Sequence, residues 1–232
     1  MTRPALSKLA APAVAQLDES LSDQVYQHLR WALILGDFAP GDGISIRRAA
    51  AELGTSMTPV REALKRLASE RALTSSANRS FRVPVLEPKR IADLFFVRSC
   101  LEAVATELAT PKLTAAQIRR LDELATLMDQ DIGAGDLRQY LSRNYSFHFT
   151  IYTAAGNGEL VSVIEGLWAQ TGPFLAAGVW RVGMTEDWRT RHGEIAQAIR
   201  ARDAAEARRL IELDIGWGTQ VFQAMADAGT AS

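Results

Sequence analysis

The chain has 232 residues, of which 47% are hydrophobic and 23% are charged, the ordinary composition of a soluble globular protein. This composition excludes a wholly disordered or collagen-like chain. No run of 18 apolar residues occurs, so we expect no transmembrane helix and no membrane partner. Cys100 is the only cysteine, which excludes an internal disulfide and fits a cytoplasmic location. The Ala-rich start is interrupted by Pro12, and we interpret residues 1–18 as a disordered arm.

The net charge of −1 hides an uneven distribution of charge along the chain. Residues 45–82 contain 8 Lys and Arg against 3 Asp and Glu, whereas residues 85–232 contain 15 against 19. A basic segment followed by a larger acidic one indicates two tasks, of which only the first suits a polyanion. We therefore predict a DNA-binding domain over 19–86, a second domain over 87–226 and a short tail over 227–232.

The basic segment has the pattern of a helix-turn-helix. Apolar residues at positions i, i+3, i+4 and i+7 predict a helix over 46–53 and a second that begins at Thr58-Pro59. Gly54 is expected to end the first helix. Thr58 is the expected N-cap of the second helix, with Pro59 at its first helical position.

A β-hairpin is predicted to follow the two helices. Residues 72–75 and 81–85 have strand composition and flank the turn residues 77–80. A hairpin behind a helix-turn-helix forms a winged helix, and Arg79 lies in the predicted turn of this wing.

The second helix of this segment carries the residues best suited to DNA. Its apolar stripe turns inward, so Arg61 and Lys65 share an outer face, where a recognition helix contacts base edges in the major groove. Ser56 and Thr58 suit phosphate contacts at the helix start, and Arg47 suits the adjacent backbone. Such a charged face is often merely solvated, but its combination with the glycine turn and the basic hairpin favours DNA.

Residues beyond Pro88 show helical periodicity and no strand pattern, and Thr114 begins a capping box. Short loops between helices indicate an antiparallel all-helical bundle, so the predicted fold is mainly α. The six helices are expected over 89–109, 114–132, 137–155, 158–180, 187–201 and 203–226.

Five polar residues fall on the apolar stripes of these helices and can converge in the bundle interior. They are Arg98, Asn144, His148, His192 and Asp214. A buried carboxylate is costly unless it is paired or bound to a metal. Two imidazoles, a carboxylate and an amide oxygen suit a divalent metal such as zinc. A purely structural buried network explains the same pattern, and the spacing alone leaves both readings open.

The basic segment resembles the winged-helix signature of the GntR family of bacterial transcription regulators. Residues 45–67 carry the resemblance, most specifically Thr58-Pro-Val-Arg-Glu-Ala-Leu64, and Asn78-Arg-Ser-Phe-Arg-Val83 resembles the family's wing. The resemblance implies that a homodimer binds a palindromic operator. It assigns the DNA contacts to Arg47, Ser56, Met57, Thr58, Arg61 and the wing tip near Ser80. Met57 and Ser80 depart from the family's usual Arg and Gly, which changes the expected operator sequence.

Residues 89–226 resemble the FCD (FadR C-terminal domain) ligand-binding module of the FadR subfamily. The matching stretches begin at Asp93, Asn144 and Arg191. Many members hold a divalent metal with one Asp and three His, and the metal helps to bind a carboxylate effector. His148 and His192 match two of those histidines. Asn144 replaces the usual Asp, and Asp214 replaces the third His. The resemblance implies a small organic acid bound by Arg98, Asn144, His148 and His192.

The sequence therefore predicts a DNA-binding transcription regulator whose operator affinity responds to a small organic acid. The alternative is a metal-dependent helical enzyme that acts on a small carboxylate through His148, His192 and Asp214. No nucleophile motif or glycine-rich phosphate loop supports the enzyme, and it does not explain residues 45–82. Repression and activation are both compatible with the sequence.

Overall fold

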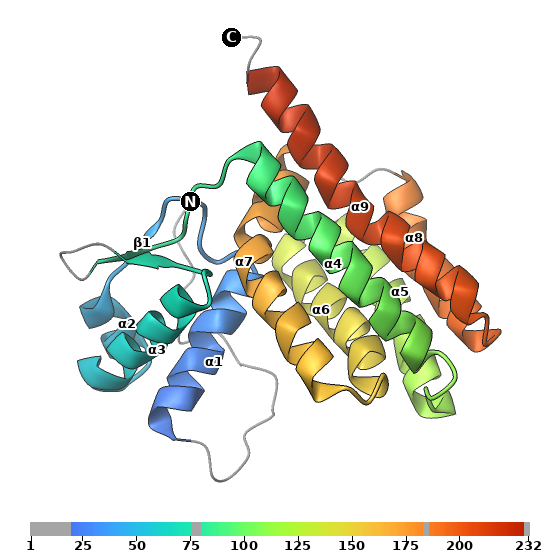
Figure 1. Ribbon diagram of the computed structural model, residues 1–232, viewed down its shortest axis with the longest axis horizontal. Helices are drawn as coiled ribbons and strands as arrows, with labels where there is room; N and C mark the ends of the chain where they lie inside the picture. Colours follow the sequence, from blue (N-terminus) through green and yellow to red (C-terminus); the bar gives the residue numbers. More distant parts are fainter. Residues whose placement is uncertain (1–19, 76–79, 183–185, 230–232) are drawn as a thin grey trace. The chain divides into compact units, whose positions relative to one another are not determined.

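The computed structural model describes residues 20–75, 80–182 and 186–229, and Figure 1 shows the course of the chain. The described chain is mainly helical, as predicted. It divides into two compact units. Unit 1 comprises residues up to Leu86 together with Trp168–Ala177, and unit 2 comprises Glu87–Leu167 and the residues from Gly178 onward. No helix within the described ranges is long and apolar enough to cross a membrane.

Unit 1 contains the predicted helix-turn-helix. Helix α1 (Leu21–Ile34) precedes α2 (Ile46–Glu52) and α3 (Met57–Ser69), and α3 packs against both other helices. The buried residues of α3 are Pro59, Val60, Ala63, Leu64 and Leu67, so the predicted apolar stripe is confirmed. The turn between α2 and α3 passes through Gly54 at φ +64°, a conformation that glycine adopts without steric cost.

The start of α3 differs from the prediction. The N-cap is Ser56, and α3 begins at Met57, so Thr58 lies inside the helix and Pro59 is its third residue. The first four N–H groups of a helix have no partner within it, so Pro59 sacrifices no helical hydrogen bond at this position. The prediction of Thr58 as the N-cap is therefore wrong by two residues.

The wing is a three-stranded antiparallel sheet rather than a two-stranded hairpin. Strand β2 (Thr74–Ser75) and strand β1 (Gly43–Ile44) both pair with β3 (Phe81–Arg82), which gives the order β1-β3-β2. The predicted hairpin is confirmed by the pairing of Thr74 with Arg82. Strand β1 lies directly after a segment rich in turn residues and was not predicted.

One stretch of a later helix belongs to unit 1. Helix α7 (Gly158–Val182) contributes residues 168–177 to this unit. Gly172 lies so close to the end of α1 that an added Cβ would be 2.5 Å from the carbonyl oxygen of Leu33. An added Cβ on Gly36 would likewise collide with the Cβ of Ala176. Gly172 therefore allows α7 to meet the end of α1 backbone to backbone, and Gly36 leaves room for the Ala176 side chain beside the turn after α1.

Unit 2 is a bundle of helices built around α4 (Pro88–Ala109). Helix α4 packs against α6 (Leu137–Ala154) and α9 (Ala204–Gly229). Helix α5 (Ala115–Ala134) packs against α6 and α8 (Glu186–Arg200), and α8 packs against α9. The capping box of α5 is confirmed, because the side chains of Thr114 and Gln117 each accept a hydrogen bond from the other residue's backbone N–H.

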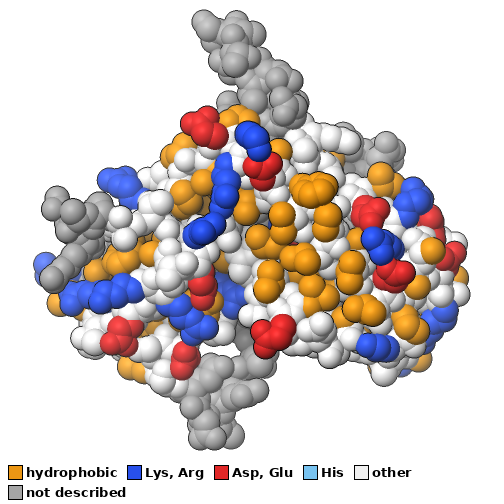
Figure 2. All heavy atoms as spheres, viewed as in Figure 1, with side chains coloured by type: hydrophobic (Ala, Val, Ile, Leu, Met, Phe, Trp, Pro, Cys, Tyr) orange, Lys and Arg blue, Asp and Glu red, His pale blue; other side chains and the backbone are white. Residues whose placement is uncertain are grey.

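The outer side of α4 is unusually apolar for a surface helix. Phe96, Cys100, Val104 and Leu108 are all exposed and follow one another at intervals of four residues, so they form one stripe. The exposed fraction of Phe96 is 69%. Figure 2 shows hydrophobic side chains gathered over this region. We call this stripe the apolar face of α4.

Candidate nucleic-acid interface and metal centre

Helix α3 is fixed in place by polar contacts with α1. The Tyr26 hydroxyl donates a hydrogen bond to Glu70, and burial together with this bond raises the pKa of Tyr26 to about 12. The guanidinium of Arg66 pairs with Asp23 at 3.2 Å and lies 3.7 Å from the centre of the Tyr26 ring. Arg66 therefore links α3 to α1.

Other cations of the helix-turn-helix have no such role. Arg48 pairs with Glu52 within α2. Within the described part of the chain, Arg47, Arg61 and Lys65 form no ion pair and no side-chain hydrogen bond. Arg47 and Lys65 are exposed, and the buried Nε of Arg61 has no hydrogen-bond acceptor among the described residues. Cations that the protein leaves without counter-charges are suited to an external polyanion.

The remaining predicted DNA contacts lie at the start of α3 and in the wing. Ser56, Met57 and Thr58 are all exposed at the N-terminus of α3, and the Ser56 side chain makes no capping hydrogen bond. The N–H groups of this first turn have no partners within the helix, which favours phosphate contact. Ser80 is exposed beside β3, and Arg79 lies outside the described residues.

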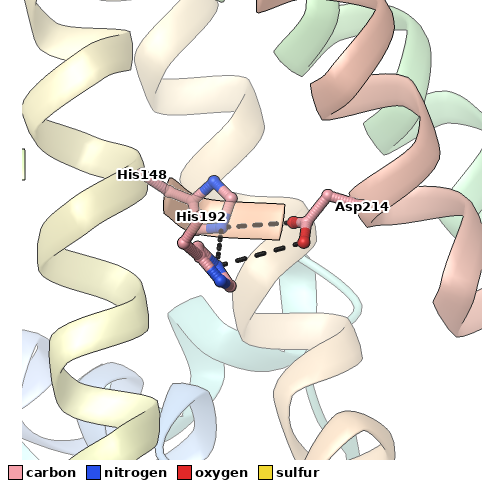
Figure 3. A group of neighbouring side chains, drawn as sticks. All are labelled: His148, His192 and Asp214. Carbon is pink, nitrogen blue, oxygen red and sulfur yellow. Dashed lines mark hydrogen bonds and ion pairs between the residues drawn. The ribbon is translucent and has the colours of Figure 1, made fainter. Parts of the chain in front are cut away.

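A second cluster of polar residues lies buried within unit 2. Helix α6 supplies Asn144 and His148, α8 supplies His192 and α9 supplies Asp214, so three helices meet at one point (Figure 3). The Nε2 atom of His148 is 3.4 Å from Oδ2 of Asp214 and 3.3 Å from Nε2 of His192. His192 Nε2 is also 2.9 Å from Oδ1 of Asn144. Four of the five polar residues that the sequence predicted to converge in the bundle interior therefore lie together.

The charge states in this cluster follow from its burial. Burial lowers the pKa of His192 to about 4, so its imidazole is neutral at pH 7. Burial alone would raise the pKa of Asp214, but His192, His148 and Arg98 outweigh that effect and lower it. Asp214 is therefore an ionised carboxylate between two imidazoles. Phe147 packs edge-on against both imidazoles, and its ring centroid lies 5.0 Å from that of His192 and 5.5 Å from that of His148.

The donor set fits a divalent cation. One atom from each of His148, His192 and Asp214 lies within 4.8 Å of the other two. Oδ1 of Asp214 is buried and accepts no hydrogen bond from any described residue, which is costly for a carboxylate oxygen without a cation. Two imidazole nitrogens and a carboxylate oxygen are ordinary zinc ligands, and the amide oxygen of Asn144 can add a fourth ligand.

Arg98 is buried in α4, but its nearest acidic partner is a residue that the sequence analysis did not single out. Its Nε donates to Oε1 of Glu102 at 2.7 Å, and the Glu102 side chain is completely buried. Tyr152, also buried, donates to the other oxygen of Glu102 at 2.6 Å. Both residues follow a predicted site residue by four positions, and this spacing is the signal that could have revealed them.

Comparison with known proteins gives this architecture a family. Residues 21–83 match the family model of bacterial regulatory proteins of the gntR family, and residues 93–215 match the FCD domain. The chain is 35% identical over 156 residues to the HTH-type transcriptional regulator McbR of Escherichia coli. The aligned region covers 67% of this chain and 71% of McbR. It is 28% identical over 206 residues to the gluconate operon transcriptional repressor of Bacillus subtilis, and that alignment covers 85% of this chain and 83% of the repressor.

The solved structures agree with the sequence comparison. The structure of Escherichia coli McbR/YncC superimposes with a TM-score of 0.83 at 29% identity, covering 89% of this chain and 99% of that one. The protein thus belongs to the GntR family of transcription regulators, and it carries the FCD domain at the C-terminal side of its winged helix. Its relatives are regulators, so the enzyme alternative is set aside.

Proposed function

We propose that the protein is a homodimeric regulator that binds a palindromic operator through α3 and the wing. The observation that carries this proposal is that Arg61 and Lys65, four residues apart on the outer side of α3, form no ion pair with any residue that the structure describes. In the major groove Arg61 would contact a guanine edge, and Lys65 and Arg47 would contact phosphates. Such binding to the genome would occur in the cytoplasm.

The apolar face of α4 would form the dimer contact. Monomeric proteins rarely expose a contiguous hydrophobic stripe of this kind, and a two-fold axis lets one stripe cover its own copy. Two copies related by such an axis present two recognition helices, which is what a palindromic operator requires. Because Cys100 lies within the stripe and is the chain's only cysteine, its reactivity toward a thiol reagent reports directly on this contact.

The buried cluster of unit 2 would hold a divalent metal, with zinc as the expected ion. His148, His192 and Asp214 would be its ligands, and Asn144 would supply a further oxygen. A bound divalent cation offers a small organic acid a positive charge to coordinate. Arg98 would bind the same carboxylate, because the planar guanidinium of arginine pairs with carboxylates through parallel hydrogen bonds.

The experiment that tests this function starts with the full-length protein and fragmented genomic DNA. Fragments that it retains define the operator, and the affinity for that operator is then measured with and without Zn²⁺ and a panel of small organic acids. We expect one class of acid to change operator affinity by roughly 5- to 150-fold. Unchanged operator affinity across the panel would refute control by an effector. A protein that retains no DNA fragment would refute operator binding.

A separate measurement tests the metal. Elemental analysis of the purified protein after Zn²⁺ loading and removal of free ion should find about one zinc per chain, and His148→Ala should abolish it. The matched control is His28→Ala, which removes a partly exposed histidine of α1. Wild-type protein that retains no zinc after this treatment would contradict the proposed metal site.

A further inference from the structure

A line of hydrogen bonds runs from α4 to the proposed metal centre. Glu102 accepts a hydrogen bond from Arg98 through Oε1 and another from the Tyr152 hydroxyl through Oε2, at 2.7 Å and 2.6 Å. The Tyr152 oxygen lies 2.9 Å from Nδ1 of His148. All four side chains are buried, and the opposite side of the His148 ring faces Asp214 and His192.

The number of protons in this line determines which nitrogen of His148 is protonated. A phenol has one proton, and an ionised carboxylate can only accept. The Tyr152 proton is therefore used in the bond to Glu102, and the Tyr152 oxygen can take part in the second contact only as an acceptor. The donor of that contact must be Nδ1–H of His148. A neutral imidazole with a proton on Nδ1 carries its lone pair on Nε2.

We propose that Glu102 and Tyr152 are positioning residues for the metal centre: they fix a proton on Nδ1 of His148, so that Nε2 of this ring faces Asp214 and His192 and is available to a cation bound between them. This inference rests on the proposed metal site. A metal-ligating histidine needs its second nitrogen fixed in this way, because otherwise the ring divides between two tautomers and two orientations.

The same carboxylate joins two parts of the proposed effector site. Glu102 holds the Arg98 guanidinium with one oxygen and, through Tyr152, the metal-ligating imidazole with the other. An anionic effector that moves Arg98 therefore acts on the hydrogen bond that orients His148. Helix α4 thus contributes to the metal centre without supplying a ligand.

Tyr152→Phe tests the inference, because it removes only the hydroxyl. We expect the Zn²⁺ affinity, measured by competition with a chromogenic chelator, to fall by about 10- to 100-fold. Imidazole ¹⁵N–¹H correlation spectra of the metal-free protein should show Nδ1–H at His148 in wild type and a mixture of tautomers in the variant. A merely structural role for the hydroxyl would not change the tautomer.

The matched control is Tyr145→Phe. Tyr145 also lies on α6 and also donates to a glutamate, Glu165, at 2.7 Å. It should leave both the Zn²⁺ affinity and the tautomer unchanged. Glu102→Gln, which retains an acceptor for Tyr152 but removes the charge beside Arg98, should lower the affinity less than Tyr152→Phe.

The two proposals fail in different ways. Wild-type protein that binds no Zn²⁺ overturns the metal site itself, and with it the positioning role of Glu102 and Tyr152. Wild-type protein that binds Zn²⁺ while Tyr152→Phe binds equally well, with His148 still protonated on Nδ1, overturns the positioning role and leaves the metal site standing.

Discussion

The outer face of α3 and the interior of the helical bundle differ in how their charged groups are paired. On α3, Arg61 and Lys65 are left without an acidic partner among the described residues. In the bundle, Arg98 is paired with Glu102, and Asp214 lies between two imidazoles. Charge at the surface is stabilised by water until a partner arrives, whereas buried charge must be compensated within the fold. The first arrangement indicates an external polyanion, and the second indicates an internal ligand site.

The largest expected effect comes from breaking the buried pair. Arg98→Met leaves the Glu102 carboxylate buried without its cation, which we expect to destabilise the bundle by about 3–5 kcal/mol in urea unfolding. The double variant Arg98→Met/Glu102→Leu removes both charges and should recover most of that loss. Arg120→Met, which breaks the exposed pair with Glu123, should cost at most about 1 kcal/mol. A similar loss of stability from Arg98→Met and from Arg120→Met would contradict the distinction between buried and exposed charges.

The next effect concerns the apolar face of α4. Val104→Glu places two like charges against each other across a two-fold contact, which we expect to weaken the dimer by several kcal/mol, roughly 10²-fold or more. Analytical ultracentrifugation measures the change, and Cys100 should become more reactive toward a thiol reagent. Val163→Glu alters a more exposed apolar residue, which lies on α7, and should leave the dimer intact. Dimers that survive Val104→Glu would place the contact elsewhere.

The loss of a single cation on the recognition helix α3 is expected to have a smaller effect in free energy than the loss of the buried Arg98. Arg61→Ala should weaken operator binding by about 1–3 kcal/mol and relax the sequence preference at one base pair. Anisotropy titrations with the operator and with random DNA of the same length separate the two effects. Equal losses on both duplexes would show that Arg61 contacts only phosphate. Arg120→Ala, an exposed arginine of α5 in the bundle, is the control.

The smallest effect is expected at the N-caps of helices, where a substitution should lower the stability of either unit by a similar amount. Ser45 caps α2 and Thr114 caps α5, each by accepting a hydrogen bond from a backbone N–H. Replacing either by Ala should cost about 1 kcal/mol and speed hydrogen exchange in the first turn of that helix alone. Faster exchange throughout a unit would mean that the cap supports more than its own helix.

Much of this fold could be predicted from local sequence, because helices are set by local periodicity. The bundle helices predicted over 137–155 and 187–201 agree within one residue with α6 and α8 at their ends. Strand β1 escaped prediction because it is two residues long and exists only through its pairing with β3, some 40 residues away. The contact of Gly172 with the end of α1 gave no signal either, since glycine in a helix does not reveal what approaches it.

The candidate metal centre was predictable in its ligands but not in its support. His148, His192 and Asp214 stood out because polar residues on apolar stripes are rare. Glu102 did not, because glutamate is common on solvated helix faces, and its burial becomes evident only when α4 packs against α6 and α9. The identity of its partner, Tyr152, depends on the same packing.

The central claim is that α2 and α3 lay cations without acidic partners among the described residues along a DNA duplex, and the salt dependence of binding tests it most directly. For the full-length protein on its selected operator, log K should fall linearly with log salt concentration between roughly 50 and 200 mM. Lys65→Ala and Arg47→Ala should each reduce that slope by about 1. An affinity that does not change with salt, or a slope that neither substitution alters, would contradict the claim.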